Sequence, residues 1–108
     1  MKRTKPKAKR AKLRRGRVSD PAYREWILRQ PCIVTGRRDV TGHHVRRFGS
    51  PKDDRRMVPL VAQLHMRGCE LPGIPCVERG KRVFEAAHGV DLEAEIVRLN
   101  ALWEAQKC

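Results

Sequence analysis

The amino-acid sequence predicts a small α+β domain in which a β-hairpin is flanked by helices. Two short β-prone runs, Cys32–Thr35 and Gly42–Val45, are separated by a polar turn, and this pattern is typical of a hairpin. Apolar residues recur at helical spacing before and after these runs, which predicts the flanking helices. The chain has 108 residues, the length of one domain. We therefore expect a single domain at residues 18–108, preceded by a basic arm at residues 1–17.

The arm dominates the charge of the chain. The sequence has 25 Lys and Arg residues against 12 Asp and Glu residues, and 10 of the basic residues and no acidic residue lie at positions 1–17. With almost no apolar residues, the arm is expected to be disordered and to contact phosphates without sequence choice, Arg14 and Arg15 included. The alternative is a solubilising tail. The net charge of +13 favours a polyanionic partner.

The first helix is expected to begin at Asp20 and Pro21, which suit its N-cap and first turn. It should end near Gln30, before Pro31. The apolar residues of this helix follow at helical spacing: Tyr23, Trp26 and Ile27. The hairpin comes next, with the histidine-bearing run Gly42–Val45 as its second strand.

Three further helices are predicted after a basic loop that runs from Arg46 to Arg56. The first follows Val58–Leu60 and is expected to end near Cys69, because glycine and proline residues come next. The second spans residues 78–88 and is closed by Gly89. The third spans residues 91–106. Its apolar residues form one stripe: Leu92, Ile96, Leu99 and Trp103.

Two classes of protein are excluded by the same composition. No apolar run is long enough to cross a membrane, and none follows the basic N-terminus as a secretory signal requires. We therefore expect a cytoplasmic protein with no membrane partner. The cysteines should then be reduced thiols or metal ligands rather than disulfides: Cys32, Cys69, Cys76 and Cys108.

Two adjacent histidines, His43 and His44, are the first candidates for chemistry. Successive residues of a strand point to opposite faces, so the two side chains are expected to take different roles, one on a metal and one on water. A neutral histidine has the pKa that a general base needs near neutral pH.

His65 and Cys69 are four residues apart in a predicted helix, so they are expected to project from one face toward one ion. Together with His43 they would form a three-ligand site that leaves positions open for water and a phosphate oxygen. The expected cofactor is one divalent metal: zinc, magnesium or manganese. A Cys69 thiolate would favour zinc.

Other interpretations of these residues stay open. Cys69 could be a small buried apolar residue, or it could share a structural zinc with Cys32 and Cys76, although the close paired spacing of a zinc ribbon is missing. His88 is interpreted as structural. Basic residues near the histidines are expected to contact phosphate rather than only to solubilise a loop: Arg46, Arg47, Lys52, Arg55 and Arg56.

The order of these parts resembles an HNH (ββα-metal) endonuclease. The resemblance lies in three segments, with the sequences QPCI at residues 30–33, GHHVR at residues 42–46 and VPLVAQLH at residues 58–65. Residues 80–85 and 88–92 are also similar to phage and prophage HNH nucleases, including a recombinase-dependent phage nuclease. The resemblance spans most of residues 30–100.

The resemblance implies a ββα-metal core and a role for each matching residue. It implies that His43 binds the catalytic metal, that His44 is the general base and that His65 is a second metal ligand. Cys69 stands where related nucleases often have a further ligand histidine. No asparagine matches the central position of the family, and Asp54 is assigned there, to hold the hairpin loop or to orient His44.

The sequence differs from the family at its structural zinc. Val61 and Leu64 stand where the family often has cysteines, and Cys32 has no cysteine partner near Thr35. The usual zinc knuckle is therefore not expected.

The expected function is metal-dependent hydrolysis of DNA phosphodiester bonds. Two alternatives remain: a non-catalytic zinc-containing nucleic-acid-binding module, and a phage-type recombination accessory protein. DNA is the expected partner, and the sequence leaves open a recombinase partner and a homodimer.

Overall fold

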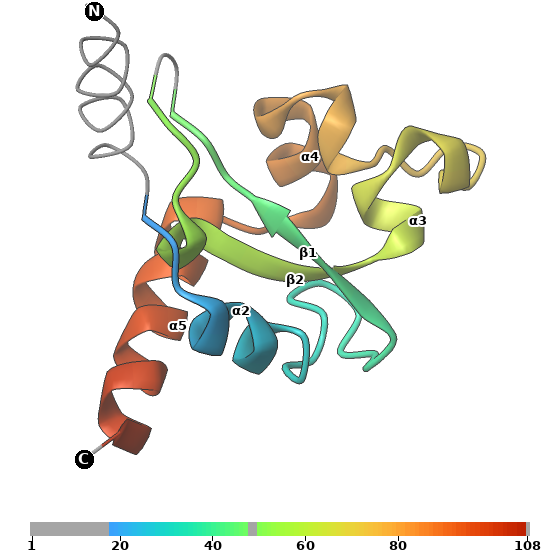
Figure 1. The fold of residues 1–108 in the computed structure, drawn as a ribbon. Helices are drawn as coiled ribbons and strands as arrows, with labels where there is room; N and C mark the ends of the chain where they lie inside the picture. Colours follow the sequence, from blue (N-terminus) through green and yellow to red (C-terminus); the bar gives the residue numbers. More distant parts are fainter. Residues whose placement is uncertain (1–17, 48–49, 108) are drawn as a thin grey trace, which may run out of the picture.

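A computed structural model describes residues 18–47 and 50–107, and it has the expected α+β class. Figure 1 shows a two-stranded sheet with helices around it. The helices and strands in chain order are α2 (Pro21–Ile27), β1 (Val40–His44), β2 (Met57–Val61), α3 (Ala62–His65), α4 (Lys81–His88) and α5 (Leu92–Lys107). Short 3-10 turns cover Asp54–Arg56, Arg67–Cys69 and Val77–Arg79. The predicted arm at residues 1–17 lies outside the described residues.

The hairpin differs from the predicted one. Strands β1 and β2 are antiparallel, with Val40 opposite Val61 and His44 opposite Met57. The histidines therefore lie on the first strand of the hairpin, and the basic segment is the connection between its strands. The expected strand at Cys32–Thr35 is wrong: this segment forms turns, in which the Gly36 N–H donates to the Cys32 carbonyl at 2.9 Å. A turn closed on itself leaves too few residues in extended form to pair with β1.

The end predicted near Cys69 for the short helix after Val58–Leu60 is also wrong. Residues Met57–Val61 form a strand that is buried along its whole length, and the helix that follows ends at His65. Met66 is extended, with φ −115° and ψ 134°, and separates α3 from the 3-10 turn at Arg67–Cys69. A short apolar run buried on both faces has no periodicity that distinguishes a strand from a helix.

The other helices follow their local signals. The carboxylate of Asp20 caps α2 by accepting a hydrogen bond from the Tyr23 N–H, although α2 ends at Ile27 rather than near Gln30. Gly89 ends α4 with a left-handed φ of 66°. The predicted start at residue 78 is wrong: Val77–Arg79 form a 3-10 turn, and Gly80, with φ 135°, separates it from α4. Helix α5 spans nearly the predicted residues.

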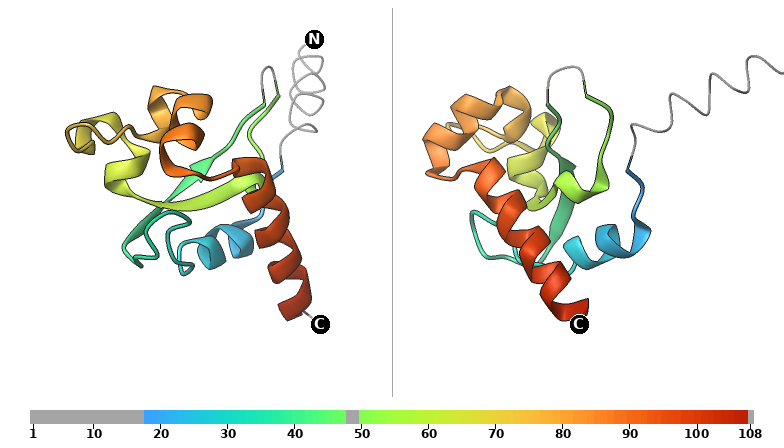
Figure 2. Two further views of the ribbon diagram at one scale, coloured as in Figure 1. Left: turned by 180° about the vertical axis from the view of Figure 1, so that it is seen from behind. Right: turned by 90° about the vertical axis from the view of Figure 1, so that its left-hand side faces the viewer.

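The hydrophobic core lies between the hairpin and its helices. Figures 1 and 2 show α2 and α5 toward one side of the hairpin and α3 and α4 toward the other. Helix α5 buries Leu92, Ile96 and Leu99 in this core. No helix in the described part of the chain combines the length and apolar character needed to span a membrane.

Candidate functional site

The histidines meet where the hairpin runs into α3. His43 lies near the end of β1, and His65 is the last residue of α3, which follows β2 directly. Because β2 pairs with β1, this continuous connection carries His65 back over the hairpin beside His43. The two imidazole rings lie edge to face, with centroids 5.0 Å apart and an interplanar angle of 66°.

Both histidines of this pair favour the neutral form. The pKa of His43 is lowered to about 4, mainly by burial and to a smaller extent by the neighbouring His65 and His44. Burial also lowers the pKa of His65. Two neutral imidazoles each keep one unprotonated ring nitrogen at neutral pH, which is the form that binds a metal ion.

The geometry of the pair fits two ligands of one ion. Imidazoles bound to one ion through nitrogens at about 2.1 Å have ring centres roughly 5 Å apart. The observed separation of 5.0 Å matches this value. Imidazole nitrogens suit zinc and other first-row divalent metals. We therefore regard His43 and His65 as the residues that could hold a metal.

Cys69 does not complete the expected three-ligand group. The argument for Cys69 needed a continuous helix, and α3 ends four residues before it. Its thiol lies on an exposed 3-10 turn, whereas Cys32 and Cys76 are buried. Across residues 18–47 and 50–107, no group of three or more His, Cys, Asp or Glu side chains could hold a metal. Neither the predicted triad nor a zinc site shared by three cysteines is formed by these residues.

His44 faces a different partner, the carboxylate of Asp54. Its Nε2 lies 2.8 Å from Asp54 Oδ1. In the described part of the chain, Asp54 is the only buried charged residue, at 5% exposure. It comes from the 3-10 turn just before β2, so the strand pairing that sets the register also brings Asp54 to His44. This is the contact expected if Asp54 orients His44.

Two groups at the start of α2 hold the Asp54 carboxylate. The Asp20 backbone N–H donates to its Oδ2 at 2.8 Å, and Arg24 Nε lies 3.4 Å from the same atom. Burial raises the pKa of Asp54, but these contacts and the His44 hydrogen bond outweigh burial and leave the pKa below its usual range. Asp54 is therefore an ionised carboxylate at neutral pH.

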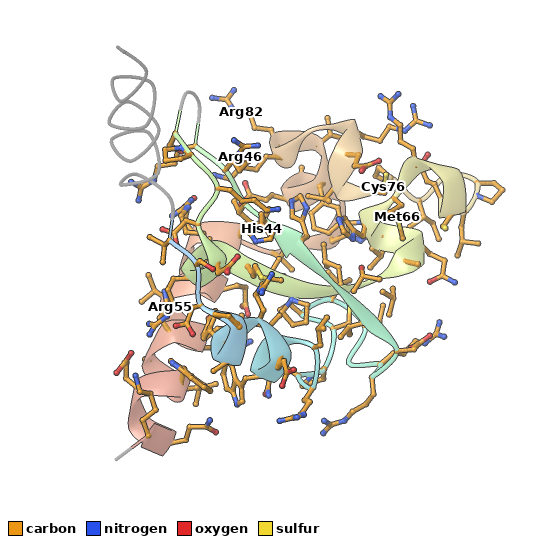
Figure 3. All side chains as sticks on the ribbon, viewed as in Figure 1. His44, Arg46, Arg55, Met66, Cys76 and Arg82 are labelled. Atoms are coloured by element: carbon orange, nitrogen blue, oxygen red, sulfur yellow. The ribbon has the colours of Figure 1, made fainter. Side chains whose placement is uncertain are left out.

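The basic residues of the connection fall into two groups. Arg46, Arg47 and Lys52 are exposed. Arg55 instead donates to Asp20 at 2.9 Å and to Glu104 at 3.1 Å. Figure 3 shows Arg46 beyond the end of β1 and Arg55 beside α2 and α5.

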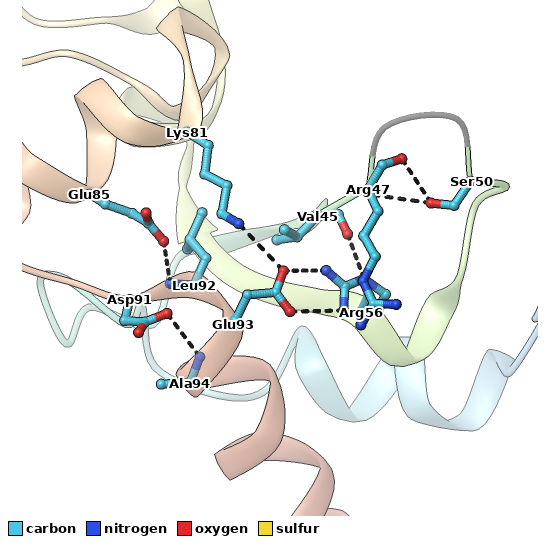
Figure 4. A network of polar contacts seen from close by, with 10 residues as sticks. All are labelled: Val45, Arg47, Ser50, Arg56, Lys81, Glu85, Asp91, Leu92, Glu93 and Ala94. Atoms are coloured by element: carbon cyan, nitrogen blue, oxygen red, sulfur yellow. Dashed lines mark hydrogen bonds and ion pairs between the residues drawn. The ribbon is translucent and has the colours of Figure 1, made fainter.

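Arg56 also has internal partners. Both of its terminal nitrogens donate to the Glu93 carboxylate, and its Nε donates to the Val45 carbonyl at 2.9 Å (Figure 4). Arg55 and Arg56 thus have a structural role within the fold, and the phosphate contacts predicted for them stay a prediction. The predicted contacts of Arg14 and Arg15 lie outside the described residues.

Sequence reasoning missed three residues that support the site: Thr41, Asp20 and Arg24. Thr41 could have been found, because it precedes His43 by two residues on a strand and so shares its face. Its hydroxyl lies 2.7 Å from His65 Nδ1. Asp20 and Arg24 gave no local signal, since 34 and 30 positions separate them from Asp54. His88, interpreted as structural, has its Nε2 2.9 Å from the Pro75 carbonyl, and its ring lies 4.6 Å from the Phe84 ring at a tilt of 51°.

Comparison with protein-family models, with curated proteins and with solved structures found no match to this chain.

Proposed function

We propose that this protein is a metal-dependent endonuclease of the HNH type that hydrolyses DNA phosphodiester bonds. The observation that carries the proposal is that two adjacent histidines of β1 contact different partners. His43 pairs with His65 at 5.0 Å between ring centroids, while the adjacent His44 pairs with Asp54. A pair of neutral imidazoles beside a carboxylate-bound histidine provides metal ligands and a general base in one small region.

The hydrogen bond to Asp54 determines which nitrogen of His44 can take a proton. An ionised carboxylate only accepts hydrogen bonds, so His44 Nε2 carries the hydrogen and donates it to Asp54 Oδ1. In the neutral ring, Nδ1 then keeps its lone pair. Nδ1 is therefore the atom of His44 that would remove a proton from water, and Asp54 would stabilise the imidazolium that forms.

The reaction follows from these assignments. His44 Nδ1 takes a proton from a water molecule, the water oxygen forms a bond to phosphorus, and the P–O3′ bond breaks. The departing oxygen takes a proton from solvent, which leaves a 3′ hydroxyl and a 5′ phosphate. A divalent ion held by His43 and His65 would supply positive charge against the charge that develops on the phosphate and the departing oxygen.

The charge of the chain supports DNA as the substrate. The exposed Arg46, Arg47 and Lys52 lie on the connection that begins directly after His44. Their side chains would hold the phosphate backbone near the histidines without reading the base sequence.

The test compares His43→Ala and His44→Ala in metal content and in plasmid nicking with Mg²⁺, Mn²⁺ and Zn²⁺. Loss of His43 should lower metal affinity and activity together. Loss of His44 should leave metal binding intact and lower the nicking rate on the order of a hundredfold or more. His88→Gln is the matched control, because His88 lies outside the site and a glutamine amide can still donate to the Pro75 carbonyl.

Two results would count against the proposal. If His44→Ala nicks DNA like the parent, His44 is not the general base. If the parent binds DNA and metal but cuts with none of the three ions, the non-catalytic zinc-containing module becomes the better explanation.

A further inference from the structure

The hydroxyl of Thr41 lies between two polar atoms, and it cannot donate its hydrogen to both. Thr41 Oγ1 is 2.8 Å from the Leu60 carbonyl oxygen and 2.7 Å from His65 Nδ1. Both distances are within hydrogen-bonding range. A threonine hydroxyl has one hydrogen to donate, so only one of the two contacts can use it.

The carbonyl of Leu60 decides where that hydrogen goes. A carbonyl oxygen has no hydrogen of its own, and two oxygens 2.8 Å apart repel each other unless a hydrogen lies between them. Thr41 must therefore donate to Leu60. Its oxygen is then left to accept from His65, which requires a hydrogen on His65 Nδ1.

We propose that Thr41 is a positioning residue that holds the neutral His65 ring in its Nδ1–H tautomer and so presents the Nε2 lone pair for a divalent metal. The metal part of this inference rests on the proposed function. The tautomer rests on the two contacts of Thr41 alone. An imidazole in water prefers a hydrogen on Nε2, so the protein would be imposing the less common form.

The arrangement has a clear chemical use. Histidines that bind metals commonly donate their other ring N–H to an oxygen of the protein, which sets both the tautomer and the direction of the ring. Thr41 is two residues before His43 on β1 and faces Leu60 on β2. The hairpin register thereby couples the orientation of His65 to the strand that carries His43.

The experiment measures the tautomer directly in the full chain. Long-range ¹H–¹⁵N correlation spectra of ¹⁵N-histidine-labelled, metal-free protein at neutral pH distinguish a protonated from an unprotonated ring nitrogen. The parent should show His65 protonated at Nδ1 and unprotonated at Nε2. Thr41→Val keeps the shape and the β-branch but removes the hydroxyl, so it should shift His65 toward the Nε2–H form.

Two variants control for indirect effects. Thr41→Ser retains the hydroxyl and should keep the tautomer of the parent. Thr35→Val makes the same chemical change at an exposed turn, where the hydroxyl accepts from the Arg37 N–H, and should leave His65 unchanged. Titration with Zn²⁺ or Mn²⁺ should show affinity about 10- to 100-fold weaker for Thr41→Val than for the parent and Thr41→Ser.

The outcomes separate this inference from the proposed function. A parent His65 protonated at Nε2, or a tautomer that Thr41→Val leaves unchanged, would overturn the inference even if the protein nicks DNA. The expected tautomers in a parent that neither binds metal nor cuts DNA would uphold the role of Thr41 and overturn the nuclease proposal. Because the parent spectrum is decisive by itself, poor folding of Thr41→Val would not prevent the test.

Discussion

The Asp54 carboxylate forms its two shortest polar contacts through different oxygens, with His44 through Oδ1 at 2.8 Å and with the Asp20 backbone N–H through Oδ2 at 2.8 Å. This buried acid therefore links the candidate general base to the start of α2. Both contacts require an acceptor oxygen on residue 54. Even a replacement of the same shape, such as asparagine, should therefore disturb the site.

Replacement of Asp54 by asparagine should impair both stability and activity. An amide has only one acceptor oxygen. If that oxygen faces His44, the Asp20 N–H is left without an acceptor. If it faces the Asp20 N–H, the NH₂ group donates to His44 Nε2 and holds the hydrogen of the neutral ring on Nδ1, which then has no lone pair for a water proton. A buried donor left without an acceptor costs about 1–3 kcal/mol of unfolding free energy. Urea denaturation and plasmid nicking would measure the two effects, and metal content should stay at the level of the parent. Asp53→Asn is the matched control, since asparagine is an equally good cap for the Asp54–Arg56 turn.

The two groups of arginines should separate DNA binding from stability. Arg46→Ala and Arg47→Ala should each weaken DNA binding and reduce the slope of log affinity against log salt by about 1, because each removes one phosphate contact. Arg56→Ala should instead lower the free energy of unfolding by about 1–3 kcal/mol, since it removes the Arg56 hydrogen bonds to Glu93 and to the Val45 carbonyl. Salt-dependent binding and denaturation curves would check this. A flatter salt slope for Arg56→Ala would contradict the structural role.

Deletion of residues 2–17 should weaken binding to every DNA sequence alike and flatten its salt dependence, because ten of the basic residues lie in the arm. The nicking rate at saturating DNA should persist. Fluorescence anisotropy at several salt concentrations measures the slope. An unchanged slope would mean that the arm only solubilises the protein.

Glu70 should contribute stability that is lost in acid. Its carboxylate accepts hydrogen bonds from the Arg79 side chain and the Cys76 N–H, which lower its pKa from 4.5 to about 2. A carboxylate with a depressed pKa stabilises the fold above pH 4.5, and this contribution falls as the pH drops from 4.5 to 2, where the unfolded chain binds the proton first.

Glu70→Gln should therefore be less stable than the parent at neutral pH, and the difference should shrink toward pH 2. Thermal unfolding across pH 2–7 measures it. Glu25→Gln, on the exposed face of α2, is the control for the loss of a charge. A constant difference between Glu70→Gln and the parent across this range would refute the argument.

Local signals in the sequence predicted the parts of the fold that local interactions form. The cap at Asp20 and the left-handed Gly89 involve residues within a few positions of one another. Helix α5 follows from the spacing of its own apolar residues. Strand geometry likewise predicted that His43 and His44 would take different partners.

Tertiary structure alone decided which segment pairs with the histidine strand and what each histidine meets. The choice of β2 over Cys32–Thr35 depends on burial across the whole domain, because an apolar run has the same local pattern in a strand as in a buried helix. The contacts of Asp54 with His44 and Asp20 span 10 and 34 residues. The sequence by itself determined the start of α2, the end of α4, the extent of α5 and the candidate histidines. The hairpin register, the loss of Cys69 from the group and the support from Thr41 and Asp20 required the packed chain, because each depends on residues that are adjacent only after folding.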